Sequence, residues 1–357
     1  MQAEANQLIR EAIMKTDIKG LTLQELKELI VSTGEPGYRA DQIYTFITKG
    51  IESLEDIPNI PKKLKEKLSE IAYVSKAAVY QKLESKEDET KKYLIELDDG
   101  NIVETVLMKY RHGLSICIST QVGCRMGCKF CASTLDGLVR NLTAGEILGQ
   151  IITVQKDAGE RVSNIVIMGS GEPFDNMENL ERFFELVHDE KGLTIGYRHI
   201  TVSTCGLVPQ IERLAELEIP VNLAISLHQT QQSEREKIMP VARSYSVEEL
   251  ISAAKAYSEK TKRRVTYEYA LIRGVNDNPQ TAMQLAKLLR GSLSHVNIIP
   301  VNEIKENDFK RPDMKKVREF QNILISNKIE ATVRRELGKD ISGACGQLRR
   351  STIDNKS

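Results

Sequence analysis

The chain has 357 residues, of which 41% are hydrophobic and 28% are charged, and its 50 basic residues balance its 50 acidic ones. This composition is typical of an ordinary globular protein and excludes a disordered one, and no apolar run approaches the roughly 20 residues that span a bilayer. The N-terminus carries acid early and has no apolar stretch, so we expect no signal peptide, a cytoplasmic location and no membrane partner.

The first part of the chain has the pattern of short helices. Leu23, Leu26 and Ile30 recur at helical spacing, and so do Ile43 and Ile47. We expect residues 1–75 to form a small helical N-terminal accessory domain.

Residues 76–110 change to a strand pattern. The segments 78–83, 92–97 and 102–108 are rich in branched and aromatic residues, and Asp98-Asp99-Gly100-Asn101 predicts a hairpin turn between the last two. We expect a short β extension or linker here.

From residue 111 to 340 strands and helices alternate, which predicts a parallel sheet with right-handed crossovers. Six to seven such units favour an α/β fold of the partial TIM type, a (βα)6 barrel, followed by a C-terminal loop and tail at 341–357. The expected strands are 114–119, 163–168, 198–203, 220–226, 264–271, 294–300 and 329–334. The expected helices are 143–156, 178–188, 247–259, 279–289 and 313–327.

Polar motifs follow the predicted strands at their carboxyl ends, the face on which barrel enzymes build their active sites. The motifs are a cysteine-rich loop at 124–131, Gly169-Ser-Gly-Glu-Pro173, Thr204-Cys-Gly206, Ser226-Leu-His228 and Pro300-Val-Asn302.

The cysteine loop has the spacing C-x3-C-x2-C, formed by Cys124, Cys128 and Cys131. Three clustered thiolates can hold a [4Fe–4S] cube with one iron open to a bound molecule, whereas structural zinc and electron-transfer clusters take four ligands. The spacing alone leaves zinc open, with His112, Cys117 or a more distant residue as the fourth ligand.

A loop of this kind after the first strand of a (βα)n domain resembles the radical S-adenosylmethionine (SAM) superfamily. The resemblance implies one [4Fe–4S] cluster with three cysteine ligands, whose open iron binds SAM. The Gly-Ser-Gly-Glu segment resembles the segment of that superfamily that contacts the SAM amino group. The implied SAM-binding residues are Gly171, Glu172, Ser203, Ser226, Leu227, His228 and Asn302.

Three further segments resemble one branch, the RlmN/Cfr family of RNA methyltransferases. They are Cys117-Ile-Ser-Thr-Gln-Val-Gly-Cys124, Val166-Ile-Met-Gly-Ser-Gly-Glu-Pro-Phe-Asp-Asn176 and Asp340-Ile-Ser-Gly-Ala-Cys345-Gly-Gln-Leu348. The likeness covers roughly residues 20–350. Ser170 departs from it, since the family usually has a larger apolar residue there.

The resemblance to the RlmN side of the family implies methylation of adenosine C2 in 23S rRNA, at adenosine 2503 of the peptidyl transferase centre, and at adenosine 37 of some tRNAs. The implied route is ping-pong and uses two SAM molecules per turnover. Cys345 carries the methyl group as S-methylcysteine, Glu104 accepts the C2 proton, and Cys117 resolves the adduct through a transient disulfide with Cys345. Whether Glu104 or Cys117 takes the proton stays open, and Cys205 has no assigned role.

Two other functions remain possible on these residues. One is C8 methylation of the same rRNA adenosine by the Cfr-like antibiotic-resistance branch, against which Pro173 argues, since that branch has Ala there. The other is a zinc-stabilised RNA-binding module without catalysis. The enzymatic function also implies an external electron donor of flavodoxin or ferredoxin type, and RNA contacts by the lysines Lys62, Lys63, Lys65 and Lys67.

Overall fold

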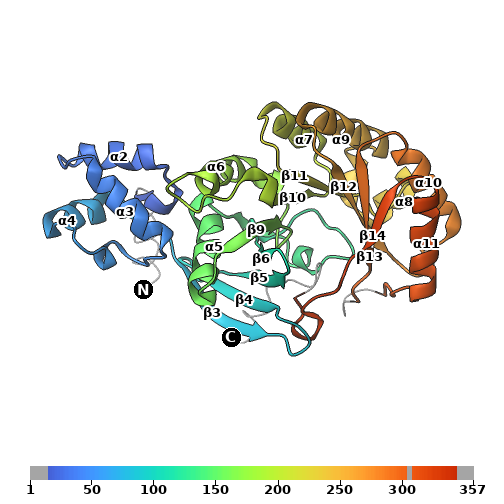
Figure 1. Cartoon of the computed structure of the whole chain (residues 1–357), viewed down its shortest axis with the longest axis horizontal. Coiled ribbons are helices and arrows are strands. Elements are labelled where there is room, and N and C mark those ends of the chain that lie inside the picture. The colour runs from blue at the N-terminus through green and yellow to red at the C-terminus, as the bar shows by residue number, and fades with distance from the viewer. Residues whose placement is uncertain (1–14, 304–307, 344–357) are drawn as a thin grey trace.

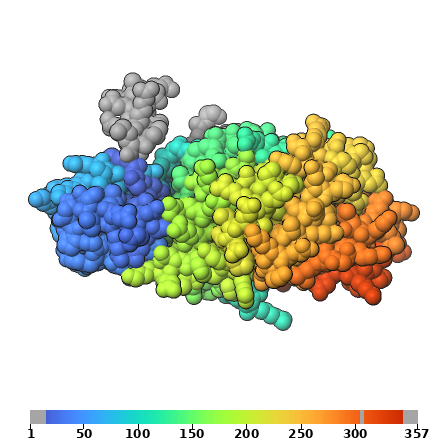
Figure 2. All heavy atoms as spheres, turned by 90° about the horizontal axis from the view of Figure 1, so that it is seen from above, coloured from blue at the N-terminus to red at the C-terminus, as the bar shows by residue number. Residues whose placement is uncertain are grey.

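The computed structural model describes residues 15–303 and 308–343 (Figure 1). The N-terminal part is a helical module with a hydrophobic core of its own, which includes Leu26, Ile43 and Leu64. It forms one end of the elongated molecule (Figure 2) and packs against helix α5 (Ala144–Ala158). Its elements are β1 (Thr16–Asp17), α2 (Leu23–Ser32), α3 (Tyr38–Thr48), α4 (Lys62–Ile71) and β2 (Ala72–Tyr73).

A ten-stranded sheet forms the body of the described structure, in the order β14-β13-β12-β11-β10-β9-β6-β5-β4-β3. Neighbours from β6 to β14 are parallel, and those from β3 to β6 are antiparallel. The antiparallel strands are β3 (Ala77–Glu84), β4 (Lys91–Leu97) and β5 (Ile102–Tyr110), which join the parallel strands through β6 (Gly113–Cys117). The other parallel strands are β9 (Val162–Ile167), β10 (Ile200–Thr204), β11 (Asn222–Ser226), β12 (Val265–Leu271), β13 (Ser294–Pro300) and β14 (Glu330–Val333).

Helices pack along the outer side of the curved sheet (Figure 1), and apolar side chains between the two layers form the main core. The helices are α5 (Ala144–Ala158), α6 (Met177–His188), α7 (Val208–Glu216), α8 (Gln232–Ile238), α9 (Val247–Thr261), α10 (Pro279–Leu289) and α11 (Met314–Ser326). The predicted α/β partial barrel is confirmed. The sequence missed α7, α8 and the small hairpin of β7 (Gln121–Gly123) and β8 (Leu138–Asn141). Among the described residues, no helix is long and apolar enough to cross a membrane.

The β extension is continuous with the barrel sheet, because β5 pairs with β6 over five residue pairs. One sheet therefore carries side chains from the extension and from the barrel on the same face. The division of the chain at residues 75, 110 and 340 stays a prediction.

Candidate active site

The cysteine loop leaves the carboxyl end of the sheet after β6 and is held by backbone hydrogen bonds to two other segments. The N–H of Cys124 donates to the carbonyl of Gly137 at 2.9 Å, and that of Lys129 donates to the carbonyl of Ile238 at 3.0 Å. Gly123 is needed where the loop begins, since its φ is +78° and a Cβ there would lie 2.0 Å from the Gly137 oxygen. These contacts fix the backbone of the loop at both of its ends.

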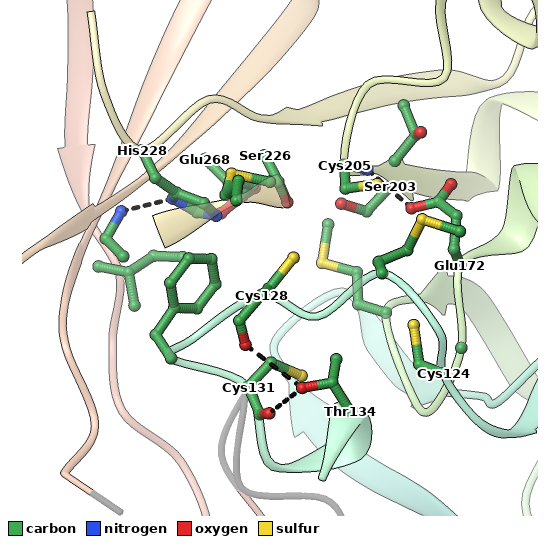
Figure 3. Close-up of a pocket in the computed structure, with 18 of the residues that line it drawn as sticks. Cys124, Cys128, Cys131, Thr134, Glu172, Ser203, Cys205, Ser226, His228 and Glu268 are labelled. Carbon is green, nitrogen blue, oxygen red and sulfur yellow. Dashed lines mark hydrogen bonds between the residues drawn. The ribbon is translucent and has the colours of Figure 1, made fainter. Parts of the chain in front are cut away.

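All three thiols of the loop line one cavity (Figure 3), with about 960 Å³ of open space including the part that reaches solvent. Met126 and Phe130 make the surroundings of the thiols apolar. Within residues 15–303 and 308–343, no three side chains of the metal-binding types are placed to share a single ion. Three thiols around one cavity match the number of cysteine ligands expected for a cube with one open iron.

The thiols of Cys124 and Cys128 resist deprotonation in these surroundings. Burial raises the pKa of Cys124 to about 12 and that of Cys128 well above its ordinary value of 9.0. A buried thiolate therefore needs a positive partner, and metal coordination is what deprotonates such thiols in proteins. The donor set fits a three-cysteine [4Fe–4S] cluster.

Glu172 lies across the cavity from the cysteine loop (Figure 3). Its carboxylate accepts hydrogen bonds from the N–H groups of Phe174 (3.1 Å) and Cys205 (2.7 Å), and burial raises its pKa. Gly171 brings the backbone close to Gln121, since its φ is +108° and a Cβ at this position would lie only 2.6 Å from Gln121 Cβ. A buried carboxylate that lines the cavity can receive an ammonium group.

His228 is held in one tautomer on the same cavity. Its Nδ1 accepts a hydrogen bond from the N–H of Ala270 at 2.8 Å, so the ring proton is on Nε2. Burial and the nearby Arg235 lower the pKa of His228 to about 3, and its ring packs edge-on against Phe130 at 4.6 Å. The imidazole is therefore neutral at physiological pH and donates through Nε2.

The remaining residues predicted to bind SAM divide into two groups. Ser203, Ser226 and Asn302 line the cavity. Leu227 does not: its side chain is fully buried in the main core. The sequence analysis missed Glu268, a buried carboxylate that lines the cavity and accepts a hydrogen bond from Asn297 Nδ2 at 2.8 Å. A charged residue between two tyrosines of an apolar strand was the sequence feature that could have indicated it.

Glu104 and Cys117 lie on one face of the sheet. Lys92 pairs with Val106, and Val106 pairs with Cys117, so these three residues form a row across β4, β5 and β6. Glu104, two residues from Val106, points to the same side. Lys92 Nζ lies 2.7 Å from Glu104 Oε1, and both side chains are almost fully buried, with 6% and 2% exposed.

The segment Leu337–Gly343 crosses this face of the sheet. Leu337 packs against Val106 and Cys117, and Gly343 lines a second cavity together with Cys117. Lys92 Nζ donates to the carbonyl of Ser342 at 3.3 Å. Asn302 lines both cavities, so the second cavity adjoins the first.

The β3–β4 turn anchors the same segment. Asp340 accepts hydrogen bonds from the Ser85 hydroxyl at 2.7 Å and the Lys86 N–H at 2.8 Å, and Asp88 accepts one from the Gly338 N–H at 3.0 Å. Cys345, the predicted methyl carrier, lies outside the described residues. The last described residue before it is Gly343.

His112 and the lysines of α4 lie apart from these cavities. The His112 ring stacks on Tyr110 and lines neither cavity. Lys65 and Lys67 donate to the backbone carbonyls of Glu55 and Thr33, whereas Lys62 and Lys63 are exposed.

Comparison with known proteins agrees with this fold. Residues 118–286 match the family model of the radical SAM superfamily, and residues 16–74 match that of the ribosomal RNA large subunit methyltransferase N-terminal domain. A solved structure described as a radical SAM methyltransferase from Sphaerobacter thermophilus superposes with a TM-score of 0.90 at 43% identity, over 94% of this chain and 99% of that one. The fold and the cavity therefore define a radical SAM methyltransferase.

Two curated relatives are similar over almost their whole length. One, from Clostridioides difficile (strain 630), is 54% identical over 94% of this chain and 98% of its own. The other, from Alkaliphilus oremlandii (strain OhILAs), is 53% identical over 96% and 99%. Both are named "Probable dual-specificity RNA methyltransferase RlmN". The chain belongs to the RlmN family of radical SAM RNA methyltransferases.

Proposed function

We propose that this enzyme methylates C2 of adenosine, at position 2503 of 23S rRNA and at position 37 of some tRNAs, by a ping-pong route through S-methylcysteine at Cys345. The observation that carries the proposal is the shared sheet face. Glu104 and Cys117 lie on it, and the segment that leads to Cys345 crosses it beside the thiol-lined cavity. A base, a resolving thiol and a methyl carrier are the groups that this route needs.

Cys124, Cys128 and Cys131 would hold the cluster, and its fourth iron would be left for SAM. When bound, the cluster supplies one electron to cleave SAM and so provides the radical that takes a hydrogen atom from the methyl group on Cys345. Glu172 would accept hydrogen bonds from the SAM ammonium group, and the Nε2–H of His228 would donate one to the same cofactor. Two SAM molecules are used per turnover, one for the methyl group and one for the radical.

Glu104 is the group that we propose takes the C2 proton once carbon has added to adenine. Its contact with the Lys92 ammonium favours the carboxylate form, which is the form a base requires. Because Lys92 also binds Ser342, the same cation touches the base and the segment of the methyl carrier.

Cys117 then resolves the adduct. The radical adduct would first give up the C2 proton to Glu104 and one electron to the oxidised iron–sulfur centre. The Cys117 sulfur would then bond to the Cys345 sulfur, the bond from the Cys345 sulfur to the transferred carbon would break with its electron pair left on carbon, and the carbon would take a proton to become the methyl group. Thiol reductants of the cytoplasm, where we propose the enzyme works, would return the disulfide to two thiols. A flavodoxin- or ferredoxin-type protein would supply the electrons for the cluster, and Lys62 and Lys63 would contact the RNA backbone.

Two variants test this route. Cys345→Ala should abolish methylated RNA while iron and sulfide content stay at the wild-type level. Cys117→Ala should trap a covalent complex of RNA with protein, seen as a shifted band on a denaturing gel. Cys205→Ala is the control for the trapped complex: its thiol lines the first cavity and not the second, so its loss should trap no RNA. Methylated RNA released at the wild-type rate by Cys117→Ala would remove Cys117 from the resolving role.

A further inference from the structure

Arg235, on α8, is a fully buried arginine that binds the backbone of Cys205 and Ser226, two residues that line the thiol-lined cavity. Its Nε donates to the carbonyl of Leu227 at 3.1 Å, and its Nη2 donates to those of Cys205 at 2.6 Å and Ser226 at 3.2 Å. Its Nη1 is buried and has no hydrogen-bond partner among the described residues. Gly206 leaves room for the guanidinium, because a Cβ there would lie 3.3 Å from Nη2.

No carboxylate in the described part of the chain forms an ion pair with Arg235, although buried charges in proteins are normally paired. Two of the carbonyl groups that hold the guanidinium belong to Cys205 and Ser226, which line the cavity. Its positive charge is thus held at the cavity wall with no anionic partner among the described residues.

Apolar surroundings strengthen the effect of the Arg235 charge on neighbouring groups. Cys128 and Cys205 belong to one hydrophobic cluster with Ile238, Met239 and Val241, and charges interact more strongly in such apolar surroundings than in water. Since Arg235 has no exposed surface, it cannot touch SAM or RNA in this structure. Its influence on the site is electrostatic.

We propose that Arg235 is the buried counter-ion of the [4Fe–4S] cluster and raises the reduction potential of the cluster. The inference rests on the proposed ligation by Cys124, Cys128 and Cys131. Reduction adds one electron from the external donor, and the added negative charge is stabilised by a nearby buried cation. Arg235 is a positioning and tuning residue, not a catalytic one.

The alternative role is purely architectural, since Arg235 also ties the ends of β10 and β11 to α8. Arg235→Gln distinguishes the electrostatic role from the architectural one, because glutamine keeps an amide donor and loses the charge. Arg235→Lys keeps the charge and loses part of the donor set. Arg125→Gln is the matched control: Arg125 follows Cys124 directly, but its side chain is 64% exposed and paired with Asp175.

The experiment is a redox titration of the full-length, anaerobically reconstituted protein, followed by electron paramagnetic resonance of the reduced cluster. Arg235→Gln should reduce the ratio of reduced to oxidised cluster at a fixed potential at least tenfold, which is a downward shift of about 59 mV for one electron. Arg235→Lys should shift the potential less, and Arg125→Gln should leave it unchanged.

Two results would overturn the proposal. One is a glutamine variant with wild-type iron content and wild-type potential. The other is an Arg235→Lys variant that folds and binds iron at the wild-type level but shifts the potential as far as Arg235→Gln, since the charge would then have no influence on the potential. A wild-type protein that binds no [4Fe–4S] cluster would instead refute the proposed function, so the two failures are distinguishable.

Discussion

Replacing Lys92 with methionine should leave the Glu104 carboxylate buried without its partner. The two side chains are 6% and 2% exposed and their charged atoms lie 2.7 Å apart, so solvent cannot substitute for the lost ammonium. Breaking a buried ion pair by removing one partner costs about 3–5 kcal/mol of the free energy of unfolding. We expect a loss in that range, and a fall in product formation of about 10²-fold or more if Glu104 is the base.

Urea unfolding of the metal-free protein measures the stability change, and RNA methylation by the reconstituted protein measures the activity. The double variant Lys92→Met/Glu104→Leu should recover most of the lost stability, because an apolar pair of similar volume can replace a buried ion pair at little cost. It should not recover activity. Lys91→Met is the matched control: Lys91 pairs with Glu84 on the surface, 3.4 Å apart, where such pairs contribute about 0–1 kcal/mol. A loss below about 1 kcal/mol for Lys92→Met would refute the reasoning.

Three shorter predictions concern His228, Gly171 and Asp340. The pKa of His228 is about 3 in the folded protein and 6.5 in the unfolded chain, so the unfolded chain binds a proton first as the pH falls. The free energy of unfolding should therefore fall by up to about 5 kcal/mol between pH 6.5 and pH 3. In urea titrations, His228→Asn should remove this part of the pH dependence. Gly171→Ala (φ +108°, crowded) should lower the unfolding free energy by about 1–3 kcal/mol more than Gly100→Ala (φ +78°, open) in the same assay. Asp340→Ala should speed proteolysis within 337–343 without changing iron content; unchanged cleavage would remove Asp340 as an anchor.

Local sequence patterns were sufficient for most of the fold. The spacing of apolar residues predicted the parallel strands and five of their helices to within a few residues, since this spacing reports which face of each element is buried. Pairing between distant segments is different. That β5 continues the barrel sheet through β6 depends on long-range register, which no local pattern reports.

The candidate site divides in the same way. The cysteine loop and the Gly-Ser-Gly-Glu segment were visible as motifs, because their residue types and spacing are local. The role of Lys92 was not visible in the sequence, because its contact with Glu104 follows from the pairing of β4 with β5. Arg235 was not visible either, because it reaches the carbonyls of Cys205 and Ser226 from α8, and no local pattern links that helix to the cysteine loop.

The position of the new methyl group on RNA tests the central claim most directly. Mass spectrometry of nuclease digests of 23S rRNA and tRNA, after incubation with reconstituted enzyme and isotopically labelled SAM, should find the label as 2-methyladenosine, and Cys345→Ala should give none. Label at C8 would place the enzyme on the rival branch. Absence of any methylated adenosine with a fully loaded cluster would contradict the account.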